Sequence, residues 1–159
     1  MLDIFVDADA CPVKGEVYRV AKRYGLKVKL VANAPMRFPE NEGITLEVVS
    51  GRFDASDDWI VDHVGELDIV ITGDIPLAAR CLKKSALVLG HKGRPFTAQN
   101  ISEALATRQI LSHLREMEDR RYGPPPFQKS DRSLFLQKLD EMVQSVRSGR
   151  WTGSANQDD

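Results

Sequence analysis

Short apolar runs alternate with amphipathic segments along the first half of the chain. Residues 2–7 (LDIFVD) form an apolar run that is typical of a buried strand. The pattern predicts strands over 2–7, 27–32, 44–49, 67–72 and 86–89, and helices over 13–24, 55–64 and 76–84. Because strands separated by helices pair in parallel with right-handed crossovers, this half of the chain predicts an α/β fold.

The second half of the chain changes to longer amphipathic helices. Residues 97–119 carry apolar side chains at helical spacing, and the segment Gly123 to Pro126 interrupts the pattern. Ser130 or Asp131 is expected to cap a final helix. The side chains expected to point inward from that helix are Phe135, Leu136, Leu139, Met142, Val143 and Val146.

The composition fits one ordinary domain. Of the 159 residues 42% are hydrophobic, which is enough to fill a core. We expect a single domain over 1–147 and a disordered polar tail over 148–159. No segment approaches the roughly 20 apolar residues of a membrane span, and the N-terminus does not resemble a signal peptide, so we expect no membrane contact and a cytoplasmic location. The net charge of -1 gives no overall basic field for nucleic acid, although it does not exclude a local basic patch.

Acidic residues follow two of the predicted strands. Asp7 and Asp9 end the first strand, and Asp74 follows the fourth. Ligand sites in parallel sheets form at the carboxyl ends of strands, and these two strands are neighbours if the strand order reverses after the first. Carboxylates gathered there repel one another unless a cation neutralises them, which favours a divalent-metal site. The alternative is that Asp9 and Asp74 merely cap the helices that follow them.

A third acidic group begins the helix predicted over 55–64. Asp57 precedes Ile60 and Val61 by three and four residues, so it shares their inward face. Asp58 points to a different side of that helix, and Asp54 stacks one turn before Asp58. Acids in a first turn stabilise a helix by about 0.3–1 kcal/mol each, which is the simpler explanation. It does not explain why Asp57 should face the sheet.

Several of these segments resemble the YaiI/YqxD family of uncharacterised bacterial proteins, whose fold belongs to the PIN-like superfamily. The matching segments are VDADACPVK (6–14), DASDDWIV (54–61), VITGDIPLA (70–78), Asn100-Ile101, and GPPPF (123–127) followed by Asp131, Arg132 and Phe135. The resemblance covers most of the chain. It implies a three-layer α/β/α PIN-like sandwich with a parallel five-stranded sheet, in the order 3-2-1-4-5, and extra C-terminal helices.

The resemblance also implies a metal-dependent ribonuclease. PIN-like nucleases bind Mg²⁺ or Mn²⁺ through acids at strand ends and helix starts and cleave RNA. Asp7, Asp57 and Asp74 match the catalytic, metal-binding acids of that pattern. The further candidate metal ligands are Asp9, Asp54 and Asp58. The expectation of nuclease activity rests on the superfamily, because the family itself is uncharacterised. The sequence predicts no particular oligomeric state.

Basic residues near the acids are candidates for binding the substrate. Lys14 follows the first acidic pair, and the loop GHKGRPF (90–96) supplies Lys92 and Arg94 after the fifth strand. Its glycines let backbone N–H groups approach a phosphate, and its phenylalanine offers a stacking surface; a solvated turn is the equal alternative. Asn100 either orients a ligand or satisfies the backbone. Other arginines are candidates to extend this patch, although each alone is more typical of surface solubility or a salt bridge: Arg37, Arg52, Arg108, Arg115, Arg120, Arg121 and Arg132.

Two other functions fit the same acids. A haloacid-dehalogenase-like phosphatase also begins with a strand that ends in Asp-x-Asp. Here, however, Cys11 occupies a position where that type prefers Thr or Val, and no second acid closely follows Asp74. The other alternative is a module that binds metal or nucleic acid without catalysis. Cys11 itself is read as a packed residue rather than a nucleophile.

Overall fold

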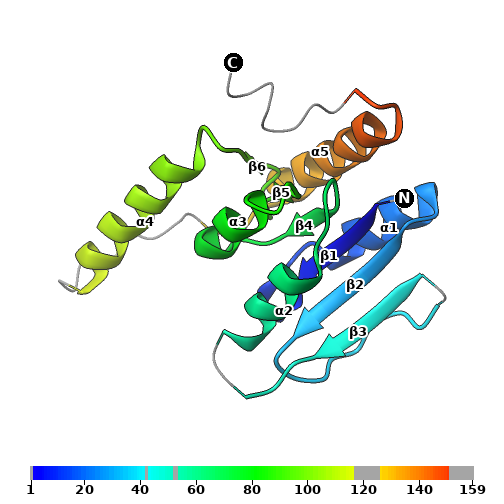
Figure 1. Ribbon diagram of the computed structural model, residues 1–159, viewed down its shortest axis with the longest axis horizontal. Coiled ribbons are helices and arrows are strands. Elements are labelled where there is room, and N and C mark those ends of the chain that lie inside the picture. Colours follow the sequence, from blue (N-terminus) through cyan, green and yellow to red (C-terminus); the bar gives the residue numbers. More distant parts are fainter. Residues whose placement is uncertain (1, 42, 52–53, 117–125, 151–159) are drawn as a thin grey trace.

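The computed structural model describes residues 2–41, 43–51, 54–116 and 126–150 (Figure 1). The strands are β1 (Asp3–Asp7), β2 (Lys27–Ala32), β3 (Ile44–Val48), β4 (Ile69–Ile71), β5 (Leu87–Leu89) and β6 (Pro95–Phe96). The helices are the short 3₁₀ helix η1 (Ala8–Ala10), α1 (Lys14–Tyr24), α2 (Ala55–His63), α3 (Ile75–Leu82), α4 (Ile101–Glu116) and α5 (Lys129–Arg147). No helix in these ranges is long and apolar enough to cross a membrane.

The strands form one mainly parallel sheet in the order β3-β2-β1-β4-β5-β6. The first five strands confirm the predicted order 3-2-1-4-5, and β6 adds an antiparallel strand to β5 that the sequence pattern did not predict. Val6 of β1 pairs with Ile71 of β4. The residues that follow, Asp7 and Thr72, therefore leave the sheet side by side.

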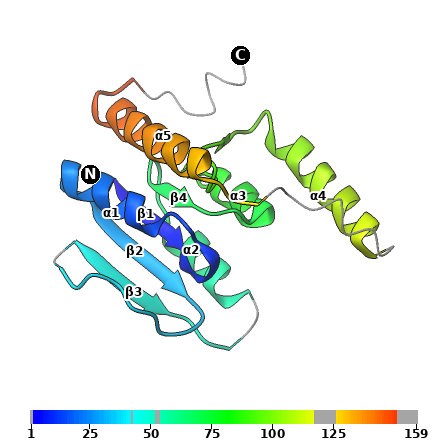
Figure 2. The ribbon, with the colours of Figure 1, turned by 180° about the vertical axis from the view of Figure 1, so that it is seen from behind.

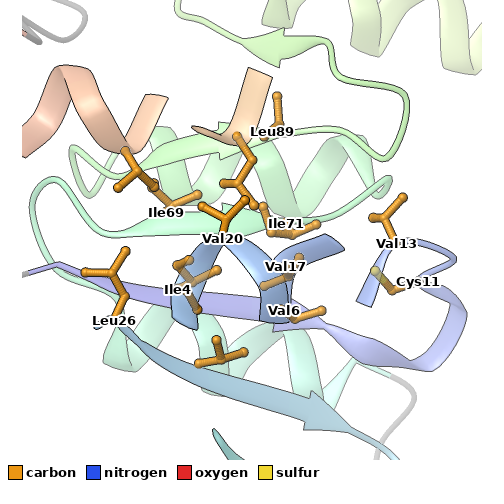
Figure 3. Close-up of a cluster of buried hydrophobic side chains, with 14 of the residues drawn as sticks. Ile4, Val6, Cys11, Val13, Val17, Val20, Leu26, Ile69, Ile71 and Leu89 are labelled. Atoms are coloured by element: carbon orange, nitrogen blue, oxygen red, sulfur yellow. The ribbon is translucent and has the colours of Figure 1, made fainter. Parts of the chain in front are cut away.

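Helices cover both faces of the sheet, which confirms the three-layer architecture (Figures 1 and 2). Alternate residues of β1 point to opposite faces, as the period of a strand requires. Ile4 and Val6 pack with α1 and α5 in one core cluster, part of which is shown in Figure 3. Phe5 packs with α2 and α3 in the second cluster. The central strands β1, β4 and β5 are buried on both sides, as is usual for a parallel sheet, whereas the edge strand β3 is largely exposed.

The predicted boundaries are close to the observed ones, with local differences. β4 is shorter than predicted, because Leu67 has a φ of 66° that is incompatible with a strand. The final helix is capped by Gln128 rather than by Ser130 or Asp131; Asp131 instead occupies the third helical position and accepts a hydrogen bond from the Gln128 N–H.

Some predictions fall outside the described residues. These are the helical residues 117–119, most of the Gly123 to Pro126 interruption, and the greater part of the predicted tail, 151–159.

α4 begins at Ile101 and packs against α3. Its Ile110 is 60% exposed, so this helix does not bury its whole apolar face.

A polar cluster joins α1 to α5 at their exposed edge. The Asp140 carboxylate accepts hydrogen bonds from Arg23, Tyr24 and Gln144, all within α1 and α5. Burial of this carboxyl opposes its ionisation, but the hydrogen bonds and the Arg23 charge outweigh burial and lower the pKa of Asp140. The charged form of Asp140 is therefore the form that stabilises the fold.

Replacing Asp140 by asparagine is expected to lower the free energy of unfolding by about 1 kcal/mol at neutral pH. The loss should be complete above the ordinary carboxyl pKa of 3.8 and should disappear as the pH falls through the lowered pKa of Asp140. Urea unfolding at several pH values measures this. Glu141→Gln is the matched control, because Glu141 is exposed and its polar partners among the described residues, Gln137 and Lys138, belong to its own helix. Equal losses in both variants would contradict the prediction.

Candidate active site

A buried threonine connects two acids at the ends of β1 and β4. The Thr72 hydroxyl donates a hydrogen bond to Oδ2 of Asp7 at 2.9 Å, and its oxygen accepts one from the Asp74 N–H at 3.0 Å. Thr72 is fully buried, so its hydroxyl fixes the half-buried Asp7 side chain. The sequence predicted Asp7 and Asp74 but missed this role of Thr72. The sequence contained one signal for this role, because Thr72 is a hydroxyl residue at the end of an otherwise apolar strand.

Asp74 caps α3 and still belongs to the acidic site. Its Oδ1 accepts a hydrogen bond from the Leu77 N–H at 3.0 Å, and Pro76 lies in the first turn. This confirms the capping role that was the simple alternative. A cap uses one carboxylate oxygen, so Oδ2 of Asp74 accepts no hydrogen bond from the described residues.

The charges of Asp7, Asp57 and Asp74 act on one another, although they come from three separate elements. Burial, together with the negative charges of Asp74 and Asp7, raises the pKa of Asp57 to about 6. Burial also raises the pKa of Asp7; the Thr72 hydrogen bond opposes this, and the charges of Asp74 and Asp9 add to it. The inward placement predicted for Asp57 brings it into this acidic site. Burial and the neighbouring negative charges therefore both disfavour the ionised forms of Asp7 and Asp57.

The arrangement of the acids limits the kind of metal ion that they could bind. Within the described ranges, no three Asp, Glu, His or Cys side chains are grouped so that they could enclose a cation. Mg²⁺ does not need such a cage, because it commonly binds one or two carboxylates and keeps several of its waters. Binding of a hydrated Mg²⁺ or Mn²⁺ by one or two of these carboxylates is compatible with this arrangement, whereas an ion that requires a full set of protein ligands is not.

Asp9 lies at the edge of this site and supports its frame. Its carboxylate is exposed and accepts a hydrogen bond from the Asn33 N–H at 3.1 Å, which joins η1 to the end of β2. Asn33 in turn accepts a hydrogen bond from the Ser56 hydroxyl in α2 at 2.8 Å. Asp9 does not cap α1, whose N-cap is Val13, so the alternative reading of Asp9 as a helix cap was wrong.

Asp54 and Asp58 lie farther from the centre. Asp54 is exposed at the N-cap of α2 without a capping side-chain hydrogen bond, and its charge raises the pKa of Asp57. Asp58 forms an ion pair with Arg80 of α3 at 2.9 Å. That pair offsets the charge of Asp58, which leaves Asp7, Asp57 and Asp74 as the central acids.

The predicted substrate-binding residues are spread around the site. Lys14 donates to the Ala8 carbonyl at 3.4 Å, and Lys92 lies 4.0 Å from Asp131 of α5. Arg94 is exposed.

Asn100 satisfies the backbone at the start of α4. It bonds the Thr97 N–H and the Pro95 carbonyl at 2.9 and 3.0 Å, which is the structural alternative given for it. Of the other arginines in the predicted patch, Arg132 pairs with Glu16. The positions Arg52, Arg120 and Arg121, and the side chain of Arg115, lie outside the described residues.

The loop between β5 and β6 is a tight hairpin turn that rests on α5. Its glycine N–H groups bond inside the turn, from Gly90 to the Arg94 carbonyl and from Gly93 to the Gly90 carbonyl, so they are not available to a phosphate. Gly93 has a φ of 85°, and a Cβ there would lie 3.0 Å from Leu134 and from the Phe135 nitrogen. Only glycine fits this contact.

A cleft of about 670 Å³ adjoins Asp74 between this hairpin and α4. Its walls include His91, which packs on Gly73 so closely that a Cβ on Gly73 would lie 3.3 Å from the imidazole. Burial lowers the pKa of His91, so the ring is neutral at pH 7. Cys11, by contrast, is buried in the core, and burial raises its pKa to about 11, which agrees with a packing role.

The raised pKa of Asp57 predicts how the stability of the fold depends on pH. Its protonated form is favoured in the folded protein, so its favourable contribution is complete below pH 3.8 and is lost as the pH rises through about 6. Asp57→Asn is expected to raise the melting temperature above pH 6 by a few degrees and to flatten this part of the pH profile. Scanning calorimetry checks it. A variant that melts lower than the wild type above pH 6 would contradict the mutual repulsion of these acids.

Comparison with known sequences gives one consistent family. The family model described as "Uncharacterized BCR, YaiI/YqxD family" matches residues 5–145. A UPF0178 protein of Rhodospirillum centenum is 54% identical over 154 residues, which cover 94% of this chain and all of the relative. A UPF0178 protein of Parvibaculum lavamentivorans is 51% identical over 147 residues, 92% of this chain and 97% of the relative. No solved structure matches significantly.

Proposed function

The chain belongs to the uncharacterised YaiI/YqxD family, and from that premise we propose that it is a metal-dependent nuclease of the PIN-like type that hydrolyses phosphodiester bonds in RNA. The observation that carries the proposal is the mutual repulsion of Asp7, Asp57 and Asp74 at the carboxyl ends of the strands. Three acids from three elements that raise one another's energy are typical of a functional site rather than of a stabilising one. A bound divalent cation offsets this repulsion.

The residues have separate roles in the proposed reaction. Mg²⁺ or Mn²⁺, when bound, lowers the pKa of a coordinated water and offsets the charge that develops on the phosphate. Thr72 holds one oxygen of Asp7, so the other oxygen has a fixed position from which to bind the cation. The Leu77 N–H does the same for Asp74. Asp57 has a pKa of about 6, and a cation bound nearby would favour its ionised form over its protonated form.

A cleavage assay tests this function. The purified protein is incubated with end-labelled single-stranded RNA of mixed sequence, with Mn²⁺, with Mg²⁺ or with EDTA. We expect shorter products with either metal and none with EDTA. Metal-dependent binding without products would favour the non-catalytic module instead, and a phosphate mimic trapped covalently on Asp7 would favour a phosphatase. Either result overturns the nuclease proposal.

A further inference from the structure

We propose that the cleft between the β5–β6 hairpin and α4 binds a single RNA strand beside the acidic site and makes the protein selective for single-stranded substrate. The identity of this ligand rests on the proposed function. The cleft is lined by Asp74, His91, Arg94, Phe96, Thr107 and Arg108, among others. Because Asp74 belongs to both, the cleft leads directly from the acidic site, and α4 lies beside α3 on this side of the molecule (Figure 1).

Two arginines from different elements line this cleft. Arg94 comes from the hairpin and Arg108 from α4, and both are exposed. Neither side chain forms an ion pair or hydrogen bond with the rest of the described chain, and the cleft lining contains two acids, Asp74 and Glu103. A guanidinium group can bind two oxygens of one phosphate through two parallel hydrogen bonds. The cleft therefore offers positive charge to a backbone that the acidic site alone would repel.

An aromatic ring lies on the same wall. Phe96 is half-buried, and its ring lies over Gly90, where a Cβ would approach it to 3.4 Å. The hairpin thus fixes the ring at the cleft. Bases of single strands stack on such rings and on arginine planes, with little dependence on sequence.

The size of the cleft determines the form of RNA that it accepts. At about 670 Å³ it falls within the range of small-ligand pockets, which suits one or two nucleotides of an unpaired strand. Paired RNA hides its bases in the helix and is recognised by shape from outside. A base that stacks on Phe96 must be unpaired, so a duplex cannot use this wall.

Binding of a short fluorescein-labelled RNA strand, followed by anisotropy in EDTA, tests the cleft without catalysis. Replacing Arg94 and Arg108 together by alanine is expected to weaken binding about tenfold or more. Phe96→Leu, which keeps an apolar side chain, should weaken it about fivefold or more. The control is Arg19→Ala, an exposed arginine of α1 on the opposite face of the sheet, which should bind as the wild type does. An unlabelled duplex of the same sequence should compete poorly.

The outcomes separate this inference from the proposed function. Arginine-dependent binding in a protein that cleaves nothing supports the cleft and overturns the nuclease. Metal-dependent cleavage with unchanged binding in the double arginine variant supports the nuclease and overturns the cleft. The cleft is also overturned if the duplex competes as well as the single strand, or if Arg19→Ala weakens binding as much as the double variant does. Melting curves identify any variant that fails to fold.

Discussion

Replacing Asp7 by asparagine is expected to reduce Mn²⁺-dependent RNA cleavage at least about 100-fold, because the neutral amide binds the cation poorly and the metal supplies several kcal/mol of transition-state stabilisation. The melting temperature should stay equal to that of the wild type or rise. Thr72 can still donate its hydrogen bond to the amide oxygen, while the repulsion from Asp74 disappears. Product formation over time and thermal melting of the same sample measure the two effects.

The matched control for this variant is Asp62→Asn. Asp62 is an exposed acid of α2 and lies on the same helix as Asp57, so its substitution changes the net charge equally. It should cleave at the wild-type rate. Full cleavage by Asp7→Asn would contradict the proposed role of the acidic site, and so would an equal loss of activity in both variants.

Replacing Phe135 by alanine is expected to lower the free energy of unfolding by about 3–5 kcal/mol, which is the usual cost of removing a fully buried ring. Phe135 is completely buried in the core cluster that joins α5 to the sheet. Its loss leaves a cavity beneath the last helix. Guanidinium denaturation followed by circular dichroism measures the change.

Leu134→Ala is the control for the packing of α5. Leu134 is the preceding residue and is 43% exposed, so its truncation should cost about 1 kcal/mol or less. Similar losses for the two variants would show that α5 is not docked through the face that contains Phe135.

The fold was largely predictable from the sequence, because it depends on patterns that are local. The apolar runs gave the parallel strands, and the period of Phe135, Leu139 and Met142 gave the inward face of α5. β6 was missed because Pro95–Phe96 is only two residues long and has no pattern of its own. The β4 boundary depended on the left-handed conformation of Leu67, which is not encoded by hydrophobicity.

The candidate site was predictable only as far as the backbone determines it. Strand ends and helix starts place Asp7, Asp57 and Asp74 near one another; the strand-end rule predicted this for Asp7 and Asp74, and helical periodicity with the family resemblance predicted it for Asp57. The partner of a surface acid depends instead on side chains from distant segments. Arg80 offsets Asp58, and Thr72 fixes Asp7, through contacts that no sequence spacing reveals.

The close packing of Gly93 against α5 has a consequence for the order of folding. The hairpin that carries Arg94 rests on the backbone between Leu134 and Phe135, which the ribosome makes some forty residues later. During synthesis, this hairpin can pair with β4 but lacks its contact with α5 until α5 has been made. On the proposed function, the cleft that binds RNA therefore reaches its final form only after α5 has docked.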